Sequence, residues 1–250
     1  MRAGPPSPDF DRLAASYDRL RPQDGAWWQR FDALVEVLAV RGGRVLDVGC
    51  GTGALAAALA ERAHARVWGV DTSAEMLEVA RGRVPRAVGL KQGRAEELPF
   101  RDGWFDAVVL SLVVHLVDRR PAFAEAARVL GPGGRLGIAT FAPEHFDSYW
   151  LNPWFPGIAE VDRRRFPTPP ELERELAAAG FEDVRFVPLE WNGVLDREDA
   201  LERIRGRHIS SFDLLDEEAI RAGSERAERE LPQRVETRLV QLVVGASVSA

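Results

Sequence analysis

Short apolar runs and longer amphipathic stretches alternate along the first two thirds of the chain. Apolar runs of this length, bounded by turn residues, predict strands. The predicted strands are Val45–Val48, Arg66–Val70, Val88–Gln92, Trp104–Ser111 and Arg135–Phe141. The stretches between them, beginning with Ala54–Arg62, carry apolar residues at helical spacing. Strands that alternate with helices are typical of an α/β fold with a parallel sheet.

The later part of the chain follows a different pattern. A helix is predicted at Pro169–Gly180, with proline at its start and a glycine suited to its end, and strands are predicted at Val184–Trp191 and Glu236–Val244. About forty residues separate these two strands, far more than a hairpin loop needs. That intervening segment reads as two helices, Arg197–Arg205 and Asp216–Leu231.

The segments beyond this alternating pattern are expected to form a cap. They comprise residues 9–28, 142–165 and 192–232. The first contains apolar residues at helical spacing, which predict one short amphipathic helix before a core helix around Trp28–Val40; they are Phe10, Leu13, Ala14, Tyr17 and Leu20. Because ligands bind at the carboxyl ends of strands in open α/β sheets, we expect the cap there. The whole chain, residues 1–250, is expected to be a single domain.

A glycine-rich turn follows the first predicted strand. Gly49, Gly51 and Gly53 let the backbone turn sharply and approach a ligand closely. Gly49, Gly51 and Ala54 also match the dinucleotide-binding pattern, so the loop alone leaves a nicotinamide-dependent oxidoreductase open. Asp47 favours another ligand, since a carboxylate at the strand end repels a pyrophosphate and attracts an ammonium group. The pattern indicates a nucleoside-like ligand with a cationic end, which describes S-adenosylmethionine.

A second acid stands at the end of the second strand. Asp71 lies 22 residues after Gly49, a spacing at which a carboxylate reaches the ribose and accepts hydrogen bonds from both of its hydroxyls. Thr72 and Glu75 have the spacing of a capping box, which predicts that Thr72 is the N-cap of the next helix. Asp71 is therefore expected at a rigid corner between strand and helix.

These motifs, with the loop Gly93–Phe100 and the segment Ser111–Leu116, resemble a class I S-adenosylmethionine-dependent methyltransferase. The likeness is to the small-molecule type related to the ubiquinone/menaquinone C-methyltransferases, over about residues 9–190. The resemblance implies a doubly wound, mostly parallel seven-stranded sheet with an antiparallel edge strand. It implies methyl transfer from S-adenosylmethionine, which leaves S-adenosylhomocysteine.

The resemblance also assigns the residues that contact the cofactor. Asp47 and the turn Gly49–Gly53, which includes Cys50, would border the methionine part, and Asp71 and Thr72 the ribose corner. The remaining contacts are Met76, Ala95 and Glu96 near the adenine, Ser111 and Leu112 beneath the sulfonium, and Tyr17 closing over the cofactor, with Arg21 reaching its carboxylate. Many relatives have Asp where this chain has Arg94, so another group must meet the adenine amino group.

Composition narrows the class of protein. The chain has 250 residues, of which 46% are hydrophobic, a formal net charge of −6 and a single cysteine. The acidity argues against a nucleic-acid substrate, and the longest apolar runs are too short to span a membrane. Met1–Pro6 lacks the apolar segment of a signal peptide, so a cytoplasmic location is expected. No spacing of His, Cys, Asp and Glu suggests a metal site.

Four features have both a chemical and a structural interpretation. His115 is a candidate general base for methyl transfer, or a histidine that is hydrogen bonded to the backbone. Cys50 is expected to fill space rather than act as a nucleophile. Arg163–Arg165 either binds an acidic acceptor or forms a solvated turn. The aromatic residues after the fifth strand either line the acceptor site or dock the cap; they are Phe141, Phe146, Tyr149, Trp150, Trp154 and Phe155.

The expected function is therefore methyl transfer to a small acceptor, apolar or aromatic, by in-line displacement. Such chemistry needs alignment and the exclusion of water rather than an enzyme nucleophile. Two alternatives remain: a non-catalytic domain that binds S-adenosylmethionine, and the nicotinamide-dependent oxidoreductase. The sequence leaves the oligomeric state open.

Overall fold

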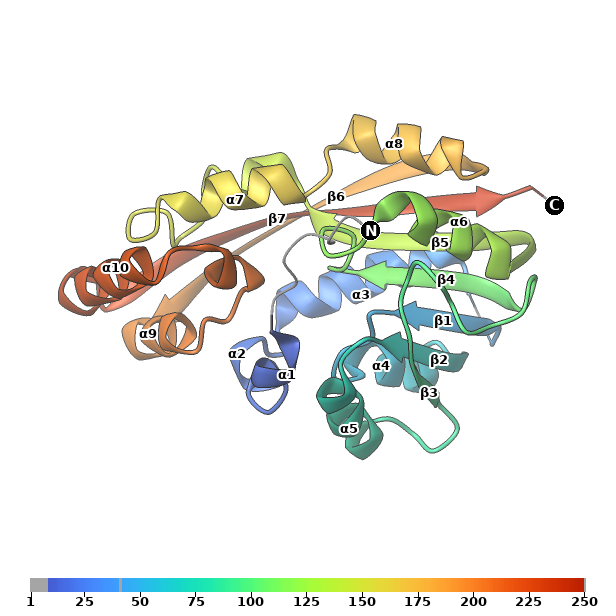
Figure 1. Cartoon of the computed structure of the whole chain (residues 1–250), viewed down its shortest axis with the longest axis horizontal. Helices are drawn as coiled ribbons and strands as arrows, with labels where there is room; N and C mark the ends of the chain where they lie inside the picture. Colours follow the sequence, from blue (N-terminus) through green and yellow to red (C-terminus); the bar gives the residue numbers. More distant parts are fainter. Residues whose placement is uncertain (1–8, 41, 250) are drawn as a thin grey trace.

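A computed structural model describes residues 9–40 and 42–249. In this part of the chain, seven strands form one sheet in the order β3-β2-β1-β4-β5-β7-β6 (Figure 1). Their bounds are β1 Arg44–Val48, β2 Arg66–Asp71, β3 Gly89–Gln92, β4 Phe105–Ser111, β5 Leu130–Phe141, β6 Phe181–Asp196 and β7 Arg234–Val248. Strands β1 to β5 pair in parallel, and β7 pairs antiparallel with both β5 and the edge strand β6. The doubly wound sheet and its antiparallel edge, both expected from the sequence, are confirmed.

Helices cover both faces of the sheet. Their bounds are α3 Gly25–Leu38, α4 Ala54–Arg62, α5 Ala74–Arg83, α6 Arg119–Val129 and α8 Pro169–Ala178. Val45 packs in a core with α3 and α4, whereas its neighbour Leu46 packs in a second core with α6 and α8. Successive residues of a strand point to opposite faces of the sheet. Residues two positions apart therefore lie on the same face, and these two core assignments fix the face of all other residues in β1.

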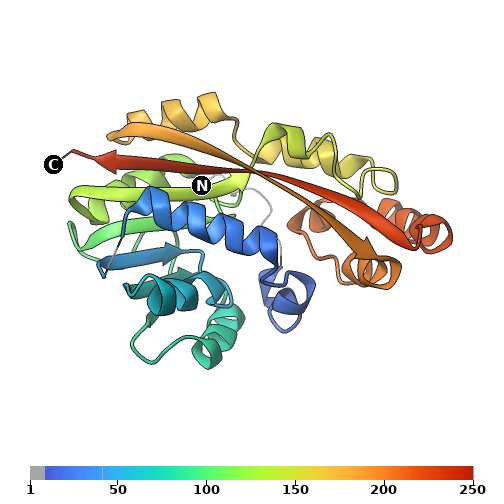
Figure 2. The same ribbon diagram turned by 180° about the vertical axis from the view of Figure 1, so that it is seen from behind.

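The antiparallel strands extend past the carboxyl ends of the parallel ones. Phe141, the last residue of β5, pairs with Gln241, and β7 continues outward from there to pair Val235 with Leu195 of β6. This extension carries α7 (Gly157–Arg165), α9 (Arg197–Arg205) and α10 (Glu217–Glu230), as both views show (Figures 1 and 2). We call these helices, with the short helices η1 (Pro143–His145) and η2 (Ser210–Leu214), the outer lobe.

The outer lobe has a hydrophobic core of its own. Its buried members come from the loop before α7, from all three helices and from η2; they include Trp150, Phe155, Ile158, Ile204, Phe212 and Ile220. The two strands, each of 15 or 16 residues, are much longer than the sequence pattern predicts. In β6, the residues beyond Trp191 alternate between exposed and half-buried, so this end of the strand has little of the apolar contrast that marks a strand.

The N-terminal segment differs from its prediction. In place of one helix there are two short ones, α1 (Phe10–Leu13) and α2 (Tyr17–Leu20). The Ser16 hydroxyl donates to the carbonyl of Leu13 at 3.3 Å, and its backbone N–H donates to the same carbonyl at 3.0 Å. Such local bonding competes with the helical ladder, which explains the break.

Two further boundaries are corrected. The N-cap of α5 is Ser73, whose hydroxyl accepts from the backbone N–H of Met76 at 3.0 Å, so the expected cap at Thr72 is wrong. The carbonyl of Thr72 instead accepts from the side chain of Gln92 at 2.9 Å. Strand β5 begins at Leu130 rather than at the predicted Arg135, and residues 131–134 form an irregularity in its register with β4. The expectation of a single domain includes residues 1–8, 41 and 250, outside the described part, and stays a prediction.

Candidate active site

The glycine turn joins β1 to α4 and has three residues in left-handed conformation. The φ angles are +72° at Gly49, +52° at Gly51 and +76° at Gly53. A Cβ at Gly49 would lie 2.4 Å from Val113, so this glycine is needed for packing. A Cβ at Gly51 would meet no heavy atom of the described residues within 4 Å. Gly51 therefore leaves its backbone open to a ligand, whereas Gly49 serves the fold.

Asp47 lies beside this turn and is almost completely buried. It shares a sheet face with Val45, the face that α3 and α4 cover. Its Oδ2 has no hydrogen-bond partner among the described residues. Burial, and then the nearby charge of Asp71, raise the pKa of Asp47 to about 7, and a backbone N–H at Ala56 opposes the shift. A buried carboxylate with an unused oxygen fits the ammonium group of the methionine moiety.

Asp71 connects the end of β2 to the glycine turn. Its Oδ2 accepts from the backbone N–H of Gly51 at 2.8 Å, and its Oδ1 from that of Ser73 at 3.0 Å. Burial raises the pKa of Asp71, although these backbone donors oppose the shift. The carboxylate stands on the same sheet face as Asp47, because Val67, four residues earlier on β2, also packs against α4. This corner fits a ribose diol.

Two predicted residues near this corner are placed by packing. Cys50 is buried, and its sulfur fills the space that a Cβ at Gly69 would enter, at 2.8 Å. Burial raises the pKa of its thiol, which disfavours the nucleophilic thiolate. Met76 is buried against Leu13 and Ala14 of the N-terminal segment. The predicted role of Cys50 as a space-filling residue agrees with these contacts.

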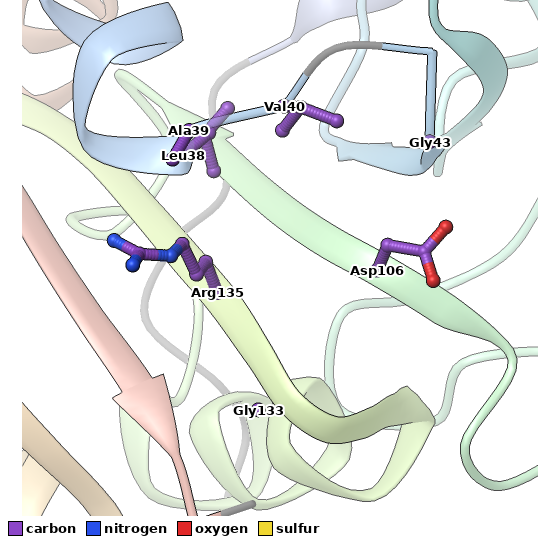
Figure 3. A pocket seen from close by; sticks show the side chains of 7 residues that line it. All are labelled: Leu38, Ala39, Val40, Gly43, Asp106, Gly133 and Arg135. Atoms are coloured by element: carbon purple, nitrogen blue, oxygen red, sulfur yellow. The ribbon is translucent and has the colours of Figure 1, made fainter.

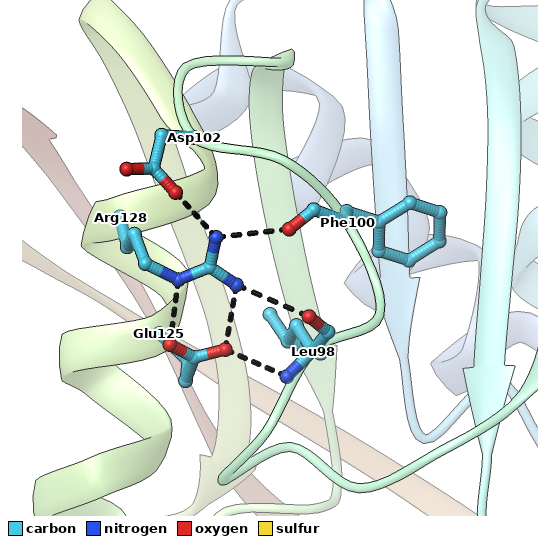
Figure 4. Close-up of polar contacts among 5 residues, drawn as sticks. All are labelled: Leu98, Phe100, Asp102, Glu125 and Arg128. Carbon is cyan, nitrogen blue, oxygen red and sulfur yellow. Dashed lines mark hydrogen bonds and ion pairs between the residues drawn. The ribbon is translucent and has the colours of Figure 1, made fainter.

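The loop after β3, which carries Ala95 and Glu96, is held by α6. Arg128 donates to the carbonyls of Leu98 and Phe100 at 3.1 and 2.9 Å, and Glu125 accepts from the backbone N–H of Leu98 at 2.7 Å (Figure 4). Arg128 also pairs with Glu125 and Asp102.

Within the same loop, Ala95 is buried, and Glu96 accepts from the backbone N–H of Asp118 at 2.9 Å. Arg94 pairs with Glu96 at 3.3 Å. The Glu96 carboxylate is thus already engaged by two partners.

Beyond β4, Leu112 has φ +57° and donates its N–H to the carbonyl of Ala139 at 2.8 Å, which turns the chain after Ser111. The ring of His115 stacks on Phe166 with centroids 3.9 Å apart. Its Nδ1 is buried without a hydrogen-bond partner in the described part of the chain. Burial, and then the charges of Arg165 and Arg21, hold the pKa of His115 well below its usual value. The imidazole is therefore neutral at pH 7.

Tyr17 and Arg21 link the N-terminal segment to the outer lobe. Arg21 Nη1 donates to the Tyr17 hydroxyl at 2.8 Å, and Arg21 Nε donates to the carbonyl of His208 at 2.7 Å. The Arg21 guanidinium also lies 4.6 Å from the centroid of the Tyr17 ring. The two residues predicted to close over the cofactor thus contact each other, and Arg21 also contacts the outer lobe.

The aromatic residues after β5 divide into two groups. Tyr149, Trp150, Trp154 and Phe155 belong to the core of the outer lobe. Phe141 and Phe146 pack instead with Phe166, the residue that stacks on His115. The structural interpretation of the cluster holds for the first group, and only the second lies beside the candidate site.

The arginine run Arg163–Arg165 forms the last turn of α7, so its interpretation as a turn is wrong. Arg163 and Arg164 are exposed and pair with Asp147 and Glu160. Arg165 turns inward, where it pairs with Asp162 at 3.3 Å and contacts Ser210 at 3.0 Å.

Three residues near the site escaped the sequence analysis. Phe166 lies between His115 and Phe141, which its ring meets at 3.9 and 5.7 Å. Arg30 of α3 donates to the side chain of Gln241 on β7 at 3.3 Å. One feature of the sequence could have pointed to Arg30. It stands four residues from both Ala26 and Leu34, which are buried, and this spacing places a charge on the apolar stripe of the helix.

A pocket of about 250 Å³ lies at the other end of the sheet (Figure 3). Its lining includes Leu38 at the end of α3 and Val40 just beyond it, with Asp106 of β4 and Arg135 of β5. Asp106 there accepts from the backbone N–H of Arg44 at 2.7 Å. The pocket is remote from the glycine turn and contains none of the predicted site residues.

The described residues offer neither a metal-binding cluster nor a membrane-spanning helix. No group of three or more His, Cys, Asp or Glu side chains there is placed to hold a metal ion. No helix in residues 9–40 and 42–249 is both long and apolar enough to cross a membrane.

Comparison with known families places the site in context. The family model described as a methyltransferase domain matches residues 46–138, which include the glycine turn, Asp71 and β4. An uncharacterised methyltransferase of Mycobacterium bovis is 42% identical over 129 residues, or 52% of this chain and 50% of the relative. The chain thus spans about half the length of the first curated relatives it matches.

A second relative is matched over most of its length. The 2-phytyl-1,4-naphthoquinone methyltransferase of Thermosynechococcus vestitus is 34% identical over 208 residues, covering 72% of this chain and 92% of the relative. Among solved structures, a phosphoethanolamine N-methyltransferase of Haemonchus contortus in complex with S-adenosylhomocysteine has a TM-score of 0.60 at 20% identity. That likeness covers 96% of this chain and 58% of the other. These matches support a methyltransferase and give no support to a nicotinamide-dependent oxidoreductase.

Proposed function

This chain belongs to the S-adenosylmethionine-dependent methyltransferases, and we propose that it transfers a methyl group from that cofactor to a small aromatic or apolar acceptor. The observation that carries the proposal is a pair of carboxylates: Asp47, which is buried, and Asp71, which is half-buried and accepts from the backbone N–H of Gly51, whose Cβ side is open. One has an unused oxygen suited to an ammonium group, and the other stands where a ribose diol would bind. The supporting relative acts on a naphthoquinone, an aromatic and apolar molecule.

When bound, the cofactor supplies a methyl group that its sulfonium already activates. The residues of the chain then bind the cofactor and the acceptor, orient them toward each other and exclude water. Asp47, the glycine turn and Asp71 would hold the amino-acid and ribose parts, with Met76, Ala95 and Glu96 around the adenine. Ser111 and Leu112 would lie beneath the reacting carbon. Positioning of this kind can supply an effective molarity of roughly 10^5 to 10^8 M, so an enzyme nucleophile is not required.

We propose that His115 accepts a proton where the acceptor arrives protonated. Its neutral ring lies against Phe166, beside the aromatic residues that would face the acceptor. A low pKa makes it a weak base at rest, and an anionic acceptor nearby would raise that pKa. His115→Gln should lower kcat at neutral pH and leave the affinity for S-adenosylhomocysteine unchanged. An unchanged pH profile of kcat would assign His115 to packing.

The outer lobe and the N-terminal segment are proposed to act as the cap over the acceptor. Arg21 joins the two through its hydrogen bond to the carbonyl of His208, and Arg12 pairs with Asp213 of η2 at 3.1 Å. Hydrogen exchange with and without S-adenosylhomocysteine tests this role. Protection should appear in residues 9–28 and in η2, and protection confined to the glycine turn would refute a closing cap.

Two experiments test the proposed function itself. Calorimetric titration should show tight binding of S-adenosylhomocysteine and none of NADH. Incubation with S-adenosylmethionine labelled on its methyl group and a pool of small metabolites should transfer label to an acceptor. Tight binding without transfer to any member of a broad pool would favour the non-catalytic alternative. A cytoplasmic location and a substrate other than nucleic acid stay predictions.

A further inference from the structure

Arg30 is a half-buried charge on the apolar stripe of α3. It stands four residues after Ala26 and four before Leu34, and both of these are buried in the core. Burial lowers the pKa of the Arg30 guanidinium to about 10, so it is still protonated at neutral pH. Partial removal of a charge from water carries a cost that a partner of opposite charge would offset.

That partner is absent from the described part of the chain. The hydrogen bond found for the guanidinium is from Nη1 to Oε1 of Gln241, at 3.3 Å, whereas a guanidinium has five N–H donors. No ion pair joins Arg30 to a carboxylate in residues 9–40 and 42–249. The nearby Asp24 accepts from the backbone N–H of Trp27 at 3.0 Å, as the N-cap of α3.

The surroundings of Arg30 are aromatic on the side of the candidate site. Gln241 pairs with Phe141 across β7 and β5, and both share the sheet face that α3 covers. From Phe141 the aromatic contacts continue through Phe166 to His115. An unpaired guanidinium therefore lies at one end of a row of aromatic rings, with the candidate base at the other.

We infer that Arg30, with Gln241, binds an anionic group on the methyl acceptor, and that the acceptor is an aromatic carboxylate. A carboxylate would take two of the free N–H donors in the bidentate geometry that a guanidinium favours. Its ring would lie along Phe141 and Phe166 and direct the reacting atom toward His115. The inference rests on the proposed function, whose substrate class it narrows.

The carboxylate of the cofactor is the other anionic group that Arg30 could bind. Gln241 lies on β7, three strands from β1 and its glycine turn in the order β1-β4-β5-β7. Neighbouring strands are 4.7–4.9 Å apart, so about 14 Å of sheet separates Gln241 from the strand that leads into the glycine turn. Arg21, hydrogen bonded to Tyr17, is the guanidinium assigned to the cofactor. Tyr17 and Arg21 also act electrostatically on Arg30, so the affinity for S-adenosylhomocysteine must be measured in Arg30→Met to separate the two anionic groups.

The test compares 2-naphthoate with its neutral counterpart 2-naphthamide, each titrated into the full chain saturated with S-adenosylhomocysteine. The wild-type protein should bind the carboxylate roughly ten-fold more tightly or better, as expected for a charge-assisted hydrogen bond. Arg30→Met should abolish the preference. Arg135→Met, at the opposite end of the sheet, is the matched control and should keep it.

A second variant tests the same inference even if Arg30→Met does not fold. Gln241→Glu keeps Arg30 and supplies an internal carboxylate, so it should fold well and still lose the preference for 2-naphthoate. In both variants the affinity for S-adenosylhomocysteine should stay within about two-fold of wild type, since a lost charged contact would cost ten-fold or more.

The outcomes separate this inference from the proposed function. A preference that survives in both variants, or a wild-type protein without one, overturns the inference alone. A loss of S-adenosylhomocysteine affinity in Arg30→Met equal to the loss for 2-naphthoate assigns the subsite to the cofactor and also overturns it. Failure of the wild-type protein to bind S-adenosylhomocysteine at all would instead overturn the proposed function.

Discussion

The carboxylate of Asp71 accepts a hydrogen bond from the backbone N–H of Gly51 at 2.8 Å, across 20 positions of sequence. The bond joins the end of β2 to the glycine turn after β1. The residue proposed to bind the ribose therefore also holds the turn that approaches the cofactor. Changes at Asp71 should affect binding and stability together.

Asp71→Ala should weaken the binding of S-adenosylhomocysteine by on the order of 2 to 4 kcal/mol, because charge-assisted hydrogen bonds to the ribose are lost. The free energy of unfolding should also fall by about 1 kcal/mol or more, since the N–H groups of Gly51 and Ser73 lose their acceptor. Calorimetry and urea denaturation measure the two effects. Asp106→Ala, which removes a carboxylate that accepts a backbone N–H at the opposite end of the sheet, should lower stability only. Unchanged affinity in Asp71→Ala would refute the ribose assignment.

The protonation of Asp47 should make cofactor binding depend on pH. An ammonium group binds the ionised carboxylate, so affinity for S-adenosylhomocysteine should rise with pH up to about 7, by at most ten-fold per pH unit, and then level off. Asp47→Asn should bind weakly and show a flat profile. A wild-type profile without a bend near neutrality would contradict the contact between Asp47 and the ammonium group.

The same carboxyl group should affect the stability of the ligand-free protein. Its folded pKa of about 7 lies above its unfolded value, so the folded protein keeps a proton that the unfolded chain releases. The free energy of unfolding should therefore decrease as pH rises from about 4 to about 7, and this contribution should be missing in Asp47→Asn. Urea denaturation at several pH values gives the comparison.

Gly51→Ala should fold and lose affinity for the cofactor. Its φ of +52° makes the substitution cost about 1 to 2 kcal/mol of stability, and the new methyl group would occupy the space left open for the ligand. Gly133→Ala is the control: its φ is +66° and its Cβ also meets no neighbour within 4 Å in the described residues, but it lies at the other end of the sheet. If both variants bind S-adenosylhomocysteine as wild type does, the turn is structural only.

Arg128→Met should loosen the loop that carries Ala95 and Glu96. The guanidinium donates to two carbonyls of that loop, so hydrogen exchange at residues 97–100 should accelerate and cofactor affinity should fall by about three- to ten-fold. Arg120→Met changes an exposed residue of the same helix and should alter neither measurement. Equal exchange in the two variants would show that α6 does not order the loop.

Trp150→Ala should reduce the stability of the protein and leave its choice of acceptor unchanged. The side chain is only 7% exposed within the core of the outer lobe, so its truncation should cost about 3 to 5 kcal/mol of unfolding free energy. Trp191→Ala, at a side chain that is 39% exposed, should cost much less. Thermal denaturation compares them, and a selective loss of acceptor turnover in a fully stable Trp150→Ala would place this residue at the acceptor instead.

The strands and helices of the core were predictable because their patterns are local. The bounds of α4 and α9 match the prediction residue for residue, since each has a clear apolar stripe and end signals. The N-cap of α5 was misplaced by one residue, because Thr72 and Ser73 are both good caps and their backbone conformations decide between them. The single N-terminal helix was wrong because contacts of Ser16 with the preceding turn compete with helix formation.

The sequence by itself determined the order of the elements, the glycine turn and the two acids at the strand ends, because strand period, glycine conformation and chain direction place these features without distant contacts. Only the tertiary structure decided which aromatic residues face the site and which fill the outer lobe. It alone brought Arg30 to Gln241 across 211 positions of sequence. That pairing depends on the register of β7 against β5 and on the packing of α3 over both, and neither is encoded in a local pattern of residues.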